Sequence, residues 1–141
     1  MIRIFSFILL LIISNNAIAT IKGETLICDK DRRGYNFITK DTVEVLDIDL
    51  KGLNITSIYH SYQVAENAIF IQKSLKEFNN DKKFKSVGWI FRRTLDYVSL
   101  DYVNGDWSRK FLWSCEITSS DQLKKRLKEK INILIKASGK K

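Results

Sequence analysis

The chain has 141 residues and a formal net charge of +8, and hydrophobic residues make up 45% of it. This length suits one domain, and this much apolar surface excludes a disordered tail or a low-complexity linker, because burial offsets the entropy cost of ordering the chain. Two cysteines and one histidine are too few for a disulfide-dense miniprotein, a structural zinc site or an iron–sulfur cluster. We therefore expect no cofactor and no metal site.

Residues 1–19 have the three parts of a secretory signal peptide. Arg3 supplies an early positive charge, residues 4–13 are apolar with one interruption, and Ala17-Ile18-Ala19 is a small-residue cleavage motif. A helix of ten residues reaches about 15 Å, roughly half of the hydrocarbon thickness of a bilayer, so a transmembrane anchor is the weaker interpretation. The sequence predicts cleavage after Ala19 and export to the periplasm or out of the cell.

Residues 20–120 are predicted to form a β-rich domain. Short apolar runs broken by Gly, Asn and Asp are typical of strands joined by tight turns. The predicted strands before the final hairpin lie at 25–28, 35–38, 43–50, 53–59, 68–71 and 87–91. In the third of these, the apolar face shifts by one residue between Val45 and Leu46, which we interpret as a β-bulge.

The most specific local signal is Asn104-Gly105, which favours a two-residue hairpin turn because both positions tolerate positive φ. Pairing the flanking residues about this turn gives a strand register that separates a polar from an apolar face. The predicted cross-strand pairs are Tyr102 with Trp107, Leu100 with Arg109, and Val98 with Phe111.

Residues 121–141 are predicted to form a basic amphipathic helix and tail. Ser119 and Gln122 fit a capping box, and Gly139 follows the helix at the position where a stop is expected. Apolar residues recur at helical spacing along one side: Leu123, Leu127, Ile131, Leu134 and Ile135. We predict that this side packs on the β-rich domain and covers an edge or an open mouth.

The predicted fold class is mainly β, or α+β by content. Seven or eight strands without intervening helices favour a curled antiparallel sheet, a small barrel or a sandwich, with one C-terminal helix.

Cys28 and Cys115 lie near the two ends of the mature domain. An exported protein meets an oxidising compartment, so we predict a structural disulfide between them. Such a bond closes a loop of about 88 residues and contributes ~4–5 kcal/mol on the chain-entropy treatment.

The positive charge is concentrated in the C-terminal helix. Residues 121–141 contain eight basic and two acidic residues, whereas residues 20–120 are nearly neutral. A basic amphipathic helix can make weak, salt-sensitive contacts with an anionic membrane or another polyanion. The candidate contact residues are Lys124, Lys125, Arg126, Lys128, Lys130 and Lys136.

Aromatic residues give two further hypotheses. A sheet face carrying Tyr97, Tyr102, Trp107 and Trp113 is a candidate aromatic binding surface. Arg92-Arg93 beside Trp89 and Phe91 is similar to a platform for single-stranded nucleic acid. Export separates the protein from nucleic acid, so we expect no nucleic-acid partner and interpret Trp89 and Phe91 as core residues of a strand.

The chain offers little catalytic chemistry. Residues 29–34 begin like a calcium loop, but Arg33 stands at the fifth position and Lys40 at the twelfth, where oxygen ligands are required. His60 has no neighbouring nucleophile motif such as G-x-S-x-G. We therefore predict no catalytic residues.

The leading hypothesis is an exported, non-catalytic, disulfide-closed protein that binds an envelope or extracellular ligand. The alternatives are a membrane-surface protein held by its basic helix and a small hydrolase with a site around His60. The sequence leaves the ligand and the oligomeric state open.

Overall fold

The computed structural model describes residues 21–72, 84–103 and 106–139. Within these ranges, only the backbone is described at 72, 84–87, 101–103, 107 and 109–111. The predicted signal peptide and the Asn104-Gly105 turn lie outside the described residues.

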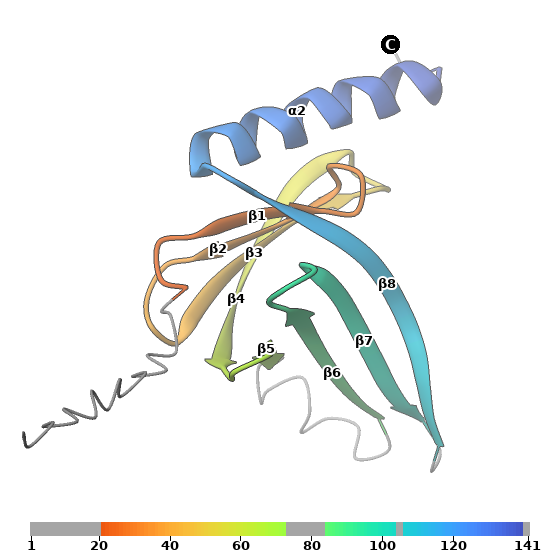
Figure 1. The fold of residues 1–141 in the computed structure, drawn as a ribbon. Coiled ribbons are helices and arrows are strands. Elements are labelled where there is room, and N and C mark those ends of the chain that lie inside the picture. The colour runs from red at the N-terminus through yellow and green to blue at the C-terminus, as the bar shows by residue number, and fades with distance from the viewer. Residues whose placement is uncertain (1–20, 73–83, 104–105, 140–141) are drawn as a thin grey trace, which may run out of the picture.

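The described residues form a closed eight-stranded barrel (Figure 1). The strands are β1 (Thr25–Cys28), β2 (Arg33–Phe37), β3 (Thr42–Asp49), β4 (Asn54–Val64), β5 (Ala68–Gln72), β6 (Phe84–Phe91), β7 (Asp96–Val103) and β8 (Asp106–Thr118). Each strand pairs antiparallel with the next, and β8 pairs with β1 to close the ring. The predicted mainly-β class with a C-terminal helix is confirmed, and closure of the sheet identifies the barrel among the three architectures.

The C-terminal helix, α2, spans Ser120–Ala137. Its N-cap is Ser119, whose hydroxyl oxygen accepts a hydrogen bond from the backbone N–H of Gln122 at 3.2 Å. Gly139 follows the C-terminal end with φ +67°, a left-handed conformation that glycine adopts without steric cost. Both predicted helix boundaries are confirmed.

One apolar core fills the inside of the barrel. It forms because alternate side chains of each strand point inward. Its buried members are Leu26, Cys28, Tyr35, Phe37, Val43, Tyr62, Ile69, Ile71, Ile90 and Tyr97. The ring of Tyr62 packs edge-on against Phe37, and its hydroxyl donates a hydrogen bond to the carbonyl oxygen of Thr39 at 2.5 Å.

A second apolar core lies outside the barrel, under α2. Leu123 and Leu127 of the helix are buried against Ile27, Leu46 and Ile48. The helix therefore covers the outer face of β1–β4 (Figure 1). We call β1–β4 the helix-covered wall and β5–β8 the uncovered wall. The prediction that α2 covers an edge or a mouth is wrong in this respect, because a closed barrel has no free edge and the helix packs on its side.

The predicted bulge in the third strand is also wrong. β3 pairs with β2 and β4 in a continuous register. The apolar face shifts because the strand has apolar partners on both sides: Val43 and Val45 pack inside the barrel, whereas Leu46 and Ile48 pack under α2. The shift in the apolar face of β3 therefore indicates a strand that is covered on both faces, not a β-bulge with an extra residue.

β2 begins at Arg33, two residues before the predicted start, and includes Gly34. A Cβ atom on Gly34 would collide with the side chain of Leu123. Glycine at this position therefore lets α2 approach the sheet closely.

The predicted final hairpin has the correct register near its turn and an incorrect one farther away. Tyr102 pairs with Trp107 and Leu100 with Arg109, as predicted. A register shift between Ser99 and Leu100 then pairs Val98 with Leu112, not with Phe111. The irregularity adds one residue to β8, which simple counting from the turn could not detect.

Trp89 and Phe91 are not core residues. Ile90 is the fully buried residue of this part of β6, and its two neighbours therefore point out of the barrel. Phe91 is 40% exposed and Trp89 is half-buried. The interpretation of these two aromatics as core is corrected by the strand register.

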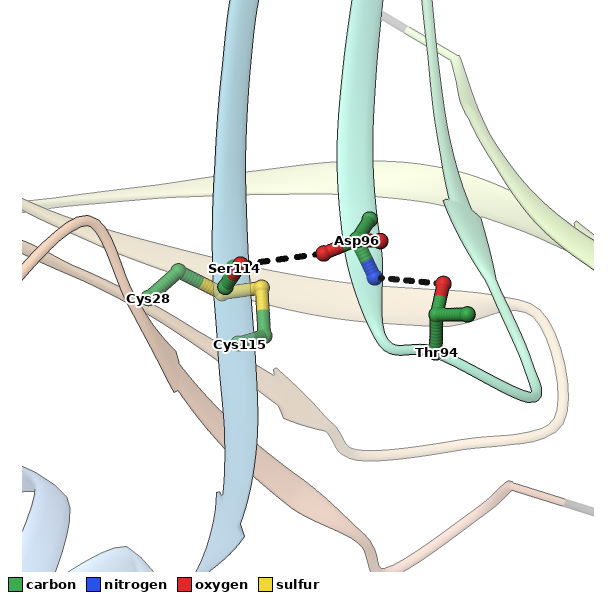
Figure 2. The surroundings of a disulfide bond; sticks show 5 residues. All are labelled: Cys28, Thr94, Asp96, Ser114 and Cys115. Carbon is green, nitrogen blue, oxygen red and sulfur yellow. Dashed lines mark hydrogen bonds between the residues drawn. A yellow bond between two sulfur atoms is a disulfide. The ribbon is translucent and has the colours of Figure 1, made fainter.

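Cys28 and Cys115 form the predicted disulfide, 87 residues apart in sequence. They are directly paired across β1 and β8, where the two walls meet. Figure 2 shows that Ser114 on β8 also donates a hydrogen bond to Asp96 of β7, whose backbone N–H donates to the hydroxyl of Thr94. The disulfide thus joins the ends of the barrel sheet where the first and last strands pair.

Candidate functional site

The barrel interior near the β1–β2 turn is filled by stacked aromatic rings and one arginine. Tyr97 stacks on Tyr35, with ring centroids 5.8 Å apart, and on Trp113, with centroids 4.4 Å apart. The guanidinium of Arg33 lies 4.9 Å from the centre of the Trp113 ring and forms an ion pair with Asp47. Such a cation–π contact and ion pair satisfy the arginine within the fold.

Burial shapes the protonation of this cluster. Burial disfavours the charge on Arg33, but Tyr35 and Asp47 together raise its pKa, so the side chain is a permanent cation. Burial and the neighbouring Tyr97 raise the pKa of Tyr35 well above its ordinary value, and Arg33 opposes this shift. Tyr35 is therefore neutral at physiological pH.

Two of the four predicted aromatic-face residues belong to this interior cluster. Tyr97 is buried and Trp113 is half-buried, which places both within the fold rather than on a free surface. Tyr102 and Trp107 are paired across β7 and β8, and their side chains lie outside the described residues.

Near the start of β1, the barrel contains an apolar pocket of about 180 Å³. Leu26 and Ile69 form its buried floor, and Ile117, 65% exposed, lies at its rim. The full lining is Ile21, Glu24, Leu26, Ile69, Arg92, Leu95 and Ile117. An apolar pocket with a few polar groups is the typical form of a small-molecule site.

The turns beside the pocket hold Arg92 and Leu95 in place. One guanidinium nitrogen of Arg92, Nη1, donates to the carbonyl oxygens of Ala65 and Glu66 at 3.1 and 3.2 Å, which ties the β6–β7 turn to the β4–β5 turn. Leu95 has φ +58°, and its backbone is fixed by hydrogen bonds to Phe91 and Cys115. A leucine in this strained conformation indicates a backbone determined by its surroundings.

A larger polar groove adjoins the pocket and shares Arg92 with it. The groove has a volume of about 680 Å³ and is lined by Glu66, Asn67, Phe91, Arg92, Arg93 and Thr94. This volume is in the range of sites that hold small molecules. Arg93 is exposed and forms no ion pair with the residues that the structure describes. The pocket and the groove together offer apolar contact beside two guanidinium groups.

The basic residues of α2 are placed differently from one another. Lys124, Lys125, Lys128 and Lys136 are exposed, and Lys130 is half-buried. Arg126 instead forms ion pairs with Asp31 of the β1–β2 turn and Glu116 of β8. Arg126 donates hydrogen bonds to both carboxylates, and these bonds raise its pKa, the bond to Asp31 more than the bond to Glu116. Arg126 fastens the helix to the barrel, and four lysines face solvent.

Residues 29–34, which begin like a calcium loop in sequence, form the β1–β2 turn and the first residues of β2. Asp29, Lys30 and Asp31 have φ values of 52°, 52° and 66°, so the segment is a left-handed turn. Both carboxylate oxygens of Asp31 accept hydrogen bonds from Arg126. Within the described ranges, no group of three or more His, Cys, Asp or Glu residues could hold a metal ion.

His60 is half-buried on β4, opposite Val43. It lines neither the apolar pocket nor the polar groove. Across 21–72, 84–103 and 106–139, no helix is long and apolar enough to cross a membrane.

No protein-family model, curated protein or solved structure matches this chain. The functional argument therefore depends on the chemistry of the pocket and groove. Sequence patterns missed the pocket because its residues come from the start of β1, β5, the β6–β7 turn and the end of β8, which only closure of the barrel brings together.

Proposed function

We propose that this protein is an exported, non-catalytic binding protein whose barrel holds a small ligand from the cell envelope or the extracellular space. The observation that carries the proposal is the apolar pocket lined by Arg92, beside the groove that shares this residue and also contains Arg93. Eight-stranded antiparallel barrels are large enough to hold one small ligand. A disulfide between Cys28 and Cys115 fits an oxidising location outside the cytoplasm.

The lining specifies the chemistry of the ligand. The side chains of Leu26, Ile69 and Ile117 suit a short hydrocarbon group, because burying apolar surface is the main driving force in such pockets. Arg93 suits a carboxylate or another anion, since guanidinium–carboxylate hydrogen bonds are charge-assisted. We therefore expect a small anionic amphiphile, with its tail in the pocket and its acid group in the groove.

A binding titration with octanoate and octan-1-ol tests this expectation, because the two probes share a tail and differ in charge. Octanoate should bind more tightly than octanol by about tenfold, the value of one charge-assisted hydrogen bond. Arg93→Gln should remove that difference and leave octanol binding unchanged. The readout is isothermal titration calorimetry at low and high salt.

Ile117→Trp should weaken both probes, because a larger side chain at the rim fills the pocket. Ile133→Trp is the matched control, since Ile133 is 60% exposed on α2, outside the pocket lining. The proposal fails if neither probe binds the wild-type protein, or if Ile117→Trp and Ile133→Trp bind octanoate equally well.

The exposed lysines of α2 favour a second candidate, contact with an anionic membrane or another polyanion. Leu123 and Leu127 pack against the barrel, so the helix offers charge but not its main apolar side. We expect this contact to be electrostatic and to weaken strongly with salt. Co-sedimentation with anionic vesicles at two salt concentrations tests it, with Lys124→Gln/Lys128→Gln as the variant.

A further inference from the structure

The outer face of the uncovered wall carries a continuous apolar row. Direct cross-strand pairing joins Phe70 of β5 to Trp89 of β6, Trp89 to Val98 of β7, and Val98 to Leu112 of β8. Phe91, two residues along β6 from Trp89, points the same way. We call these five residues the outer apolar patch.

The side chains at the two ends of the patch are exposed, and the side chain of Val98 between them is recessed. Phe70 is 38% exposed and Leu112 is 60% exposed, whereas Val98 is buried. The rings of Phe70 and Phe91 lie 6.4 and 6.2 Å from that of Trp89, so the aromatic end is one cluster. Together these side chains expose on the order of 300 Å² of apolar surface, comparable with the largest patch on a typical monomer.

Apolar side chains on both faces of a strand normally mean that both faces are covered. The helix-covered wall follows this rule, because Leu46 and Ile48 lie under Leu123 and Leu127. In the described part of the chain, no helix covers the outer apolar patch (Figure 1). The patch has the composition of an interface core, rich in aromatic residues and without charge.

We propose that the outer apolar patch binds a second copy of this chain in a two-fold symmetric dimer. A two-fold axis that runs between β6 and β7, parallel to the strands, places Trp89 of each copy over the shallow position of Val98 in the other. The same axis places Phe70 over Leu112. Trp89 therefore meets a recessed position and Phe70 an aliphatic one, which is the kind of self-complementarity that an isologous interface requires.

The area of the wall supports a dimer of modest strength. Eight residues each of β6, β7 and β8, ~26 Å long and spaced ~4.8 Å apart, together with the five residues of β5, present roughly 450 Å² per copy. The pair would bury about 900 Å² in total, which is in the range of weak, transient interfaces. We therefore expect association that depends on protein concentration in the micromolar range.

Sedimentation velocity of the mature protein, from about 1 to 500 µM, tests the proposal. Wild type should shift from monomer towards dimer across this range, and Leu112→Glu should remain monomeric because it places a charge in the interface. Ile133→Glu is the control: Ile133 is as exposed as Leu112, at 60%, but lies on α2. This control should dimerise like wild type.

Three results would overturn the dimer: a monomer at every concentration, equal association of Leu112→Glu and wild type, or loss of association in both variants. Binding of the monomer to neutral lipid vesicles through Trp89, seen as a blue-shifted fluorescence that Leu112→Glu removes, would also overturn it and assign the patch to a lipid surface. Circular dichroism of both variants verifies that they remain folded. The patch shares Phe91 with the polar groove, but the two substituted residues, Leu112 and Ile133, line neither the groove nor the pocket, so the test is independent of ligand binding.

Discussion

Both walls of the barrel carry apolar side chains on their outer faces, but these side chains are covered differently on the two walls. On the helix-covered wall, Ile27, Leu46 and Ile48 point outward and are buried because α2 lies over them. On the uncovered wall, Phe70 and Leu112 also point outward, yet both are exposed. Outward apolar side chains alone therefore do not indicate what covers a strand. The helix-covered wall is covered by α2 of the same chain, and we infer that the uncovered wall is covered by a second copy of the chain.

The two walls also differ in how they are joined to the rest of the molecule. Where β1 meets β8, the Cys28–Cys115 disulfide links the walls covalently. Arg126 of α2 adds a second link at the same place, because it binds Asp31 beyond β1 and Glu116 on β8. The helix therefore stabilises its own wall by burial and the junction by charge.

Removing the disulfide is expected to have the largest effect on the fold. Cys28→Ala/Cys115→Ala frees the ends of a segment with a sequence separation of 87, which should lower the free energy of unfolding by about 4 kcal/mol. Denaturant titration of the two proteins measures the difference. A loss below about 1 kcal/mol would mean that the strand ladder and Arg126 hold the junction without the sulfur bond.

Equivalent truncations on the two walls should differ in cost. Leu127→Ala removes a fully buried side chain between α2 and the helix-covered wall and should destabilise the protein by about 3 kcal/mol. Leu112→Ala on the uncovered wall should change stability by less than about 0.5 kcal/mol in dilute solution. Denaturant titrations below 1 µM and above 100 µM provide the comparison.

If the patch forms a dimer interface, Leu112→Ala should become more destabilising at the higher concentration, and Leu127→Ala should not. Similar costs for both substitutions at low concentration would remove the distinction between the walls.

The sequence predicted those parts of the fold whose signals are local. The Ser119 cap, the stop at Gly139 and the pairs next to the Asn104-Gly105 turn each depend on a few neighbouring residues. The Cys28–Cys115 bond was also predictable, because a single pair allows a single connectivity.

Features that depend on barrel closure were not predictable in the same way. The apolar shift in β3 resembles a bulge until α2 is placed on its outer side. Alternation along β6 cannot tell which face is inside, so Trp89 and Phe91 were assigned to the core in place of Ile90. The pocket near Arg92 combines four distant segments, and no periodicity in the sequence relates them.

Inside the barrel, Tyr35 of the helix-covered wall stacks on Tyr97 of the uncovered wall, and this contact should make the fold sensitive to alkali. Burial, and then Tyr97, raise the pKa of Tyr35 well above its ordinary value of 10.0, so the folded protein retains a proton that the unfolded chain releases. The contribution of Tyr35 to stability should therefore be constant below about pH 10 and decline as the pH rises above it.

Tyr35→Phe should reduce that alkaline decline while changing stability at pH 7 by no more than about 1 kcal/mol, because it removes the ionisable hydroxyl and keeps the ring. Tyr59→Phe, at an exposed position of β4, is the matched control and should leave the decline in place. Thermal unfolding followed at pH 7, 9, 10 and 11 distinguishes them. If both variants lose stability as steeply as wild type above pH 10, ionisation of Tyr35 does not govern alkaline unfolding, and the stacked rings join the two walls by packing alone.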